Sequence, residues 1–225
     1  MRSLIACAAL VAASAAARAQ APASAPAPSD AERVVLHAVD AWRGVKAVRA
    51  TFEQSLTNTL TGTSARATGE FQQRRPDRLS VRFTNPSGDA IVADGEFVWM
   101  YLPSSTPGQV IREPMTRDGT GTVDFTDEFL RAPLRRYAIT DLGAGVIDGR
   151  NVHAVRLVPK PGESSRFNRA TVWVDDADGY IRQFEVQESN GVTRRVHLTS
   201  LDVNVDVDAG AFTFKVPPGV KVVSR

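Results

Sequence analysis

The chain has 225 residues, of which 43% are hydrophobic and 23% are charged, and its 27 basic residues nearly balance its 25 acidic ones. This length suits one domain with a sizeable core, and the balanced charge gives no support for a nucleic-acid-binding surface. The single cysteine, Cys7, excludes a disulfide within the chain.

Residues 1–19 have the features of a cleavable signal peptide. Arg2 precedes an apolar, alanine-rich run that is too short to span a bilayer. Residues 17–19 form an A-x-A cleavage site, and residues 19–21 are the second choice. Residues 4–7 resemble a lipoprotein box, but no apolar segment precedes Cys7, so we expect no lipid there. The signal holds two of the 27 basic residues and no acidic one, so the mature chain should have 25 of each. The sequence therefore predicts an exported, soluble protein without formal net charge.

Residues 20–28 are rich in Pro, Ala and Ser and are expected to form a disordered tether before a single domain over residues 29–225. Ser29 and Glu32 form a capping box at the start of a helix. Apolar residues then recur at helical spacing, at Val35, Ala38, Val39, Trp42 and Val45. The pattern predicts an amphipathic helix packed on a sheet, which gains a ligand role only if it closes a cavity.

From Val48 onward, short alternating runs joined by Asn-Gly or Asp-Gly turns predict an antiparallel meander. Leu79, Val81 and Phe83 alternate with polar residues as in a half-buried strand. Residues 97–102 are apolar throughout, so alternation does not decide which of their side chains point inward. Further strands are predicted at residues 48–52, 66–73, 109–113, 152–158, 167–174, 180–187 and 192–201. A sheet of about ten strands or more must curl or close.

One segment interrupts the meander. Residues 115–122 are rich in Gly and Thr, and Phe125, Phe129 and Leu130 then lie on one helical face before Pro133, which is expected to end the turn. A long loop with its own helix is typical of a lid. A helix that only plugs the open end of the sheet is an equally good interpretation.

The residues that could carry chemistry do not form a catalytic or metal-binding pattern. His37, His153 and His197 lie outside any nucleophile elbow or metal-binding pair, and we interpret them as surface or pocket-edge residues. Residues 175–179 resemble a calcium loop, but further ligands are missing, and a hairpin turn is the favoured interpretation. We therefore expect no enzyme activity, no cofactor and no metal site.

With no catalytic or metal-binding pattern, the remaining candidate for a functional site is apolar surface. A curled sheet can place apolar side chains around an apolar ligand. The candidate lining residues are Phe52, Leu79, Val81, Phe83, Trp99, Phe125, Phe129 and Leu130. From the residues alone, a filled core is the favoured interpretation over a ligand cavity.

A set of spaced residues nevertheless resembles the outer-membrane lipoprotein carrier (LolA) family. Its pattern places an Arg-Pro pair before a strand and I-V-x-D-G-x-x-x-W-x-Y-x-P after the next turn. The matching residues are Arg75, Pro76, Leu79, Ile91, Val92, Asp94, Gly95, Trp99, Tyr101 and Pro103. The C-terminal sequence FTFKVPPGV, residues 212–220, also matches this family. The resemblance covers roughly the whole mature chain.

This resemblance implies an incomplete, half-open antiparallel β-barrel of about 11 strands, with an N-terminal helix and short lid helices over a hydrophobic cavity. It implies a monomeric periplasmic carrier that takes acylated lipoproteins from an inner-membrane ABC transporter. The carrier would deliver them to an outer-membrane acceptor lipoprotein such as LolB. In the family the arginine of the Arg-Pro pair bonds to the lid and keeps the empty cavity shut, and Arg75 matches it.

Two other functions remain open at this point. One is a periplasmic module that senses lipids or lipoproteins on the same fold, like certain stress-response regulators. Those regulators carry a second domain, for which this chain has no room. The other is a lipid hydrolase, against which the missing nucleophile motif argues.

Overall fold

The computed structural model describes residues 27–115 and 125–224, apart from the Phe125 side chain. The predicted signal peptide, Cys7 and most of the predicted tether therefore lie outside the described residues, as does most of the Gly/Thr-rich segment. Within the described ranges, no helix is both long enough and apolar enough to cross a membrane.

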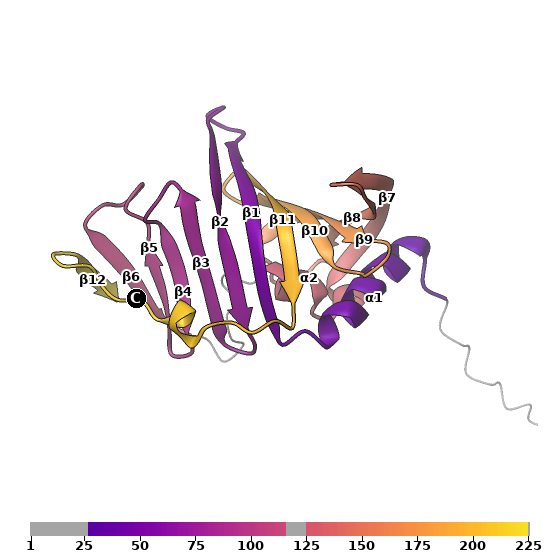
Figure 1. Cartoon of the computed structure of the whole chain (residues 1–225). Helices are drawn as coiled ribbons and strands as arrows, with labels where there is room; N and C mark the ends of the chain where they lie inside the picture. Colours follow the sequence, from indigo (N-terminus) through magenta and orange to yellow (C-terminus); the bar gives the residue numbers. More distant parts are fainter. Residues whose placement is uncertain (1–26, 116–124, 225) are drawn as a thin grey trace, which may run out of the picture.

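The described residues form one twelve-stranded sheet with three α-helices and one 3-10 helix (Figure 1). In chain order the elements are α1 (Asp30–Arg43), β1 (Ala47–Asn58), β2 (Ser64–Arg74), β3 (Arg78–Asn85), β4 (Ala90–Asp94), β5 (Phe97–Tyr101), β6 (Gln109–Pro114), α2 (Phe125–Leu130), α3 (Pro133–Arg136), β7 (Tyr137–Ile147), β8 (Arg150–Pro159), β9 (Phe167–Asp175), β10 (Ile181–Glu188), β11 (Val192–Val203), η1 (Ala209–Phe212) and β12 (Lys221–Ser224).

The order of strands across the sheet is β12-β6-β5-β4-β3-β2-β1-β11-β10-β9-β8-β7. Neighbouring strands are antiparallel, except that β12 pairs with β6 in parallel. Strands β12 and β7 are the two edges and do not pair with each other, so the sheet curls without closing. The predicted fold class, an incomplete antiparallel barrel with an N-terminal helix, is confirmed, with one strand more than the approximate number expected.

Helix α1 begins at the predicted capping box. The Ser29 backbone N–H donates to Glu32 Oε2 at 2.8 Å, and the Glu32 N–H donates to Ser29 Oγ at 3.3 Å. The buried face of the helix consists of Ala31, Val35, Ala38 and Trp42. This face packs against β7, β8 and β9, so that α1 covers part of the concave side of the sheet.

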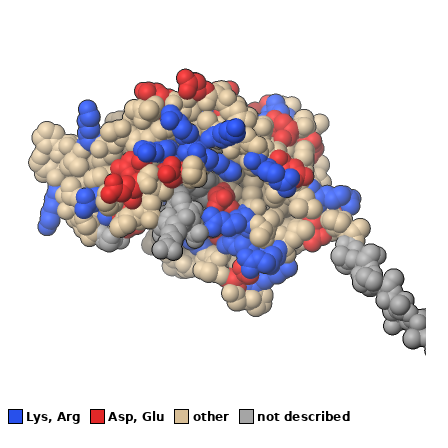
Figure 2. All heavy atoms as spheres, turned by 90° about the horizontal axis from the view of Figure 1, so that it is seen from below, with Lys and Arg blue, Asp and Glu red and all other residues tan. Residues whose placement is uncertain are grey.

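The alternation of side chains gives the sheet two different faces. On β3, Val81 and Phe83 pack toward the concave side and the main core, whereas Arg82 reaches the convex side. Seen from below, basic side chains gather near the middle of the molecule, with acidic side chains beside them (Figure 2). The concave side, toward which Val81 and Phe83 pack, is therefore the apolar one.

A C-terminal strap, defined as residues 204–220, crosses the convex face in front of the sheet before β12 begins (Figure 1). Arg49, Arg74 and Arg82, one each from β1, β2 and β3, donate hydrogen bonds of 2.5–3.4 Å to backbone carbonyls of the strap. Phe212 of the strap is buried beneath it, with the Arg74 guanidinium 5.3 Å from its ring centroid. The strap thus covers an apolar layer on the convex side that is separate from the concave core.

Three strands (β4, β7 and β12), the helix α3 and the 3-10 helix η1 have no counterpart among the predicted ranges. Strand β7 reads YAITDLGAGVI and is mostly exposed, so it lacks the alternating apolar pattern by which strands are predicted. Strand β12 has only four residues. The prediction that Pro133 ends a helical turn was wrong, because Pro133 opens α3, where its missing N–H removes no helical hydrogen bond.

Candidate functional site

A largely apolar cavity of about 390 Å³ lies between the concave face of the sheet and the helices. Its walls come from β1 to β5, β10 and β11, with Trp42 contributed by α1, Thr126 by α2 and Arg166 by the segment before β9. The apolar lining includes Phe52, Phe71, Val81, Phe83, Ile91 and Met100. The volume falls in the range of roughly 300–1,000 Å³ that is usual for sites that bury a small ligand.

Gly69 has no side chain, which leaves space for two aromatic residues of the cavity wall to contact each other. It pairs with Phe52 on β1 and with Phe83 on β3, so both rings lie over its backbone. The rings contact edge to face, with centroids 5.6 Å apart. A Cβ atom at Gly69 would lie 2.8 Å from Phe52 Cζ and 2.5 Å from the Arg82 carbonyl oxygen. Only glycine fits this position without displacing its neighbours.

The cavity has an enclosed apolar end and a partly exposed polar end. At the apolar end Trp42, Val48 and Ile181 have exposed fractions of 4%, 1% and 2%. At the other end, the Glu188 and Arg194 side chains retain 21% and 27% of their accessible surface. Val48 and Gln54 mark the two ends on β1, and their spacing at ~3.3 Å per residue separates the ends by about 20 Å. The cavity therefore suits a long apolar ligand with a polar head.

Helix α2 lies beside the cavity and packs its aromatic side chain into the core. Phe129 is fully buried, and its ring contacts the rings of Phe167 and Phe184 at 5.7 and 5.4 Å between centroids. Phe184 also lines the cavity, so α2 shares an aromatic cluster with the cavity wall. Movement of α2 away from the sheet would open this cluster.

A buried polar group anchors α2 to the start of β7. Arg136 donates to the Glu128 carbonyl oxygen at 2.9 Å and to Glu128 Oε1 at 2.8 Å, and it also reaches the Ser164 carbonyl at 3.0 Å. The Tyr137 hydroxyl donates to the Glu128 carbonyl oxygen at 2.9 Å. Burial raises the pKa of Tyr137 well above its ordinary value, and the Glu128 carboxylate raises it further, so this hydroxyl stays a donor.

The structure brings several of the predicted lining residues together. Phe52, Val81 and Phe83 line the cavity. Leu79 is fully buried in a small adjacent cluster with Ala93 and Val98. Of the helical residues, Phe129 belongs to the core, Leu130 packs against it, and the side chain of Phe125 lies outside the described residues.

Trp99 was predicted to line the cavity, and this prediction was wrong. Val98 and Met100 face the concave side, so Trp99 between them points to the convex face, where it stacks on Phe214 of the C-terminal strap at 5.6 Å. Its Nε1 donates to Asp94 Oδ2 at 2.7 Å. Burial alone would raise the pKa of Asp94, but this bond and those from the Phe97 and Glu96 N–H groups lower it overall. Strand β5 is apolar throughout because both of its faces are covered, one on the concave side and the other beneath the C-terminal strap.

Arg75 lies at the end of β2, where its backbone N–H donates to the Lys46 carbonyl at 2.9 Å. Its side chain is half-buried, and it has no hydrogen bond or ion pair to another described residue. Its role as a lid latch therefore stays a prediction. The sequence reasoning missed Arg136, which does contact α2 and whose only signal is its position directly before the buried Tyr137.

The other polar residues singled out in the sequence have structural roles. His153 Nε2 lies 2.7 Å from Asp141 Oδ1, and His197 Nε2 lies 2.7 Å from Asp148 Oδ2. Residues 175–179 form the turn between β9 and β10, where Arg150 and Arg182 pair with the carboxylates. In the part of the chain that the structure describes, no group of three or more His, Cys, Asp or Glu side chains could hold a metal ion.

Comparison with known proteins gives a consistent family match. A family model described as "Outer membrane lipoprotein carrier protein LolA" matches residues 43–122 and 140–215. A relative named outer-membrane lipoprotein carrier protein from Halorhodospira halophila is 27% identical, with 81% of this chain and 82% of the relative aligned. A relative of the same name from Proteus mirabilis is 25% identical, over 79% of this chain and 82% of the relative.

Solved structures share the fold at low sequence identity. An uncharacterized conserved protein from Thermus thermophilus superposes with a TM-score of 0.55 at 12% identity, over 88% of this chain and all of that one. A crystal structure of MucB superposes with a TM-score of 0.51 at 15% identity, over 85% of this chain and 65% of that one. These likenesses support the architecture of an open, curled sheet.

Proposed function

We propose, because the chain belongs to the outer membrane lipoprotein carrier protein LolA family, that its cavity holds lipoprotein acyl chains during their transfer to the outer membrane. The observation that carries the proposal is the largely apolar cavity of about 390 Å³, open at its polar end, between the sheet and the helices. Phe52, Val81 and Phe83 contact the acyl chain, and Leu79 packs beside Val81 on the same face of β3. The domain that performs this function spans residues 29–225.

The energetics of the cargo define what such a carrier must do. Each buried methylene of an acyl chain contributes about 0.8 kcal/mol, so a lipoprotein does not leave a bilayer unaided. An inner-membrane ABC transporter supplies this work, and the carrier shields the chains in the periplasm. An outer-membrane acceptor lipoprotein then receives them. The chain acts as a monomer without cofactor, and no step requires it to be an enzyme.

A release experiment tests this function. The mature protein, from residue 20 onward, is added to spheroplasts that lack their own carrier and contain a labelled outer-membrane lipoprotein. We expect the lipoprotein to appear in the supernatant in complex with the added protein, and then to transfer to outer-membrane vesicles. Lipoprotein that stays on the spheroplasts with a folded, well-behaved protein would contradict the proposal.

A pair of variants connects this release to the cavity. Val81→Asp places a carboxylate in the apolar wall, whereas Thr84→Asp places one on the exposed convex side of the same strand. We expect the first variant to lose lipoprotein binding while thermal unfolding confirms that it is folded, and the second to bind normally. Equal binding by both would show that the cavity is not the site.

The lid latch is part of the same proposal and concerns Arg75. Arg75→Leu removes the donors of the guanidinium but keeps much of the apolar stem, so it acts mainly on the balance between open and closed forms. We expect loading from the transporter to continue and release to the acceptor to slow, so that the loaded carrier accumulates. Transfer assays measure both steps separately. Unchanged rates at both steps would remove Arg75 from the mechanism.

The alternative of a sensing module is not favoured. The named relatives that align over most of their length are carriers. The likeness to MucB supports the common fold alone and covers only 65% of that chain.

A further inference from the structure

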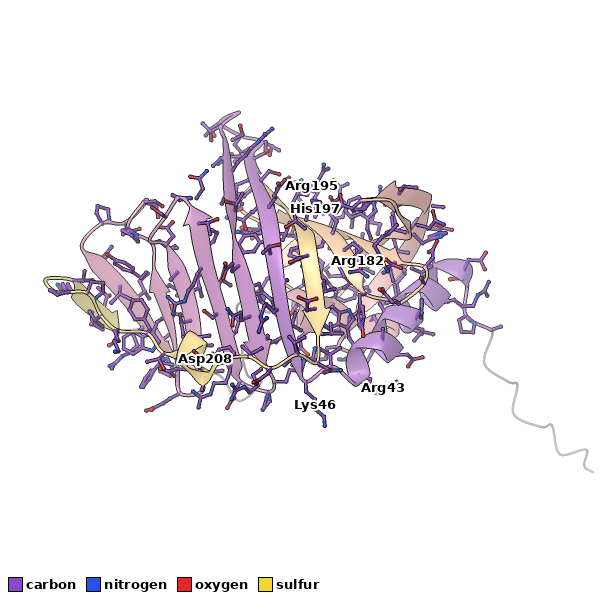
Figure 3. All side chains as sticks on the ribbon, in the orientation of Figure 1. Arg43, Lys46, Arg182, Arg195, His197 and Asp208 are labelled. Carbon is purple, nitrogen blue, oxygen red and sulfur yellow. The ribbon has the colours of Figure 1, made fainter. Side chains whose placement is uncertain are left out.

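Three neighbouring strands each contribute one polar side chain to the polar end of the cavity. Gln54 comes from β1, Arg194 from the start of β11 and Glu188 from the end of β10, and all three line the cavity. Arg194 lies opposite Leu56 and Val186 in the register, so its side chain shares the concave face with them. The neighbouring Arg195 points to the convex face, as Figure 3 shows.

Arg194 is held in place by its two polar neighbours. Its Nε donates to Glu188 Oε1 at 3.1 Å, its Nη2 lies 3.1 Å from the same oxygen, and its Nη1 donates to Gln54 Oε1 at 2.9 Å. Glu188 also accepts a hydrogen bond from Asn190 at 3.2 Å. The acceptors of the group are thus largely engaged, and the ion pair leaves it without net charge.

The unused polar groups are donors. A guanidinium carries more N–H groups than Arg194 employs, and the amide nitrogen of Gln54 has no acceptor among the described residues. Donors at the edge of a low-dielectric cavity favour a ligand that presents oxygen acceptors. A neutral head is favoured over a phosphate, because Glu188 neutralises the charge of Arg194, and the other cationic lining residue, Arg166, faces the Glu128 carboxylate at 3.5 Å.

We propose that Gln54, Glu188 and Arg194 form a head-group subsite that takes the ester and amide carbonyls of the acylated cargo, while the acyl chain extends toward Trp42. The proposal rests on the carrier function and adds to it the orientation of the ligand. The partly exposed polar end is the entry side, and the enclosed apolar end receives the chain terminus. The subsite thereby distinguishes acylated glycerol heads from other apolar chains.

The test compares two synthetic lipopeptides that differ only in the head. One carries an S-diacylglyceryl cysteine with ester carbonyls, and the other has ether links and chains of the same length. We expect the mature wild-type protein to bind the ester lipopeptide roughly tenfold more tightly, as one or two hydrogen bonds to a charged donor would give. Arg194→Met should bring the two affinities together.

A matched control uses the neighbouring arginine. Arg195 is exposed on the convex side and pairs with Glu185 at 2.6 Å, so Arg195→Met removes an equivalent side chain outside the cavity. We expect this variant to keep the wild-type preference. Arg194→Gln, which keeps an amide donor, should retain part of it.

The outcomes separate the subsite from the carrier function. Equal affinity of the wild-type protein for both lipopeptides would overturn the subsite and leave the carrier function intact, and this arm needs no variant to fold. Failure of both lipopeptides to bind would overturn the carrier function and the subsite together. Phosphatidylglycerol with the same acyl chains also presents ester carbonyls, so tighter binding of that lipid would overturn the assignment to a neutral head.

Discussion

At the scale of single residues, the cavity depends on one position without a side chain. Gly69 allows Phe52 and Phe83 to meet across β2, and backbone and aromatic atoms would both lie within 3.0 Å of an added Cβ. A sequence pattern does not reveal this role, because a glycine inside a strand reads equally well as a bulge or a weak point. Phe52 and Phe83 were predicted to line the cavity, but their contact across Gly69 follows only from the register of three strands.

We predict that Gly69→Ala lowers the free energy of unfolding by roughly 1–3 kcal/mol, as overpacking in a tight site does. Gly145→Ala is the control, because the only atom near its added Cβ is Val152 Cγ2 at 3.8 Å. Denaturant unfolding of both variants measures the difference. A Gly69→Ala protein as stable as Gly145→Ala would show that the Phe52 ring moves aside at little cost.

A second residue-scale prediction concerns Asp175. Burial alone would raise its pKa, but hydrogen bonds from Arg150, the Ala177 N–H and Arg182 outweigh it and lower the pKa to about 2. A carboxylate whose folded pKa is depressed stabilises the fold above its ordinary pKa of 3.8, and this contribution is lost as pH falls toward 2.

We therefore expect the stability advantage of the wild-type protein over Asp175→Asn to shrink by about 2 kcal/mol between pH 5 and pH 2. Denaturant unfolding at a series of pH values measures this difference. Asp176→Asn serves as the control, because Asp176 is the exposed residue next in the same turn. A constant difference across the pH range would mean that Asp175 has an ordinary pKa.

At the scale of elements, the strands with alternating apolar residues and the capped helix could be predicted from the sequence. The edge strand β7 and the C-terminal strap could not. The capping box and the apolar spacing of α1 are local signals, and they place the helix correctly. Strand β7 pairs on one side only, so its composition is closer to that of a loop. The C-terminal strap has no periodic pattern, because backbone carbonyls rather than side chains accept the hydrogen bonds that hold it.

The anchoring of α2 gives the prediction at this scale. Arg136→Met removes the closest cationic partner of Glu128. The largely buried carboxylate keeps the Tyr137 hydroxyl at 3.2 Å, the Ser165 hydroxyl at 3.5 Å and the more distant Arg166 guanidinium at 3.5 Å. Breaking such a pair costs about 3 kcal/mol. We expect lower stability and faster amide hydrogen exchange in α2 and at the start of β9.

Arg135→Met is the control for this experiment, since the Arg135 side chain is 70% exposed and its ion pair among the described residues is with Glu163. Its stability should stay within ~0.5 kcal/mol of the wild-type value. If the two variants show the same amide hydrogen exchange and the same stability, α2 is held in place by the packing of Phe129 rather than by the hydrogen bonds of Arg136.

At the scale of the whole molecule, one sheet separates two apolar layers with different uses. The concave layer surrounds a cavity, and the convex layer is filled by the C-terminal strap. The family resemblance predicted the open sheet and the cavity, because these follow from the overall order of strands. It did not place Trp99, because β5 is apolar on both faces and the strap that covers its convex side lies more than 100 residues later.

Because the two layers are separated by the sheet, we predict that ligand binding changes the environment of tryptophan side chains on the concave face only. Trp42 lines the enclosed end of the cavity, its Nε1 has no hydrogen-bond partner among the described residues, and an acyl chain would contact its ring. Trp99 is shielded behind the sheet, between Asp94 and Phe214. We expect a lipopeptide to change the tryptophan fluorescence of the wild-type protein and of Trp99→Phe, but hardly that of Trp42→Phe. A signal that disappears with Trp99 instead would place the ligand beneath the strap and make the concave cavity an ordinary packing defect.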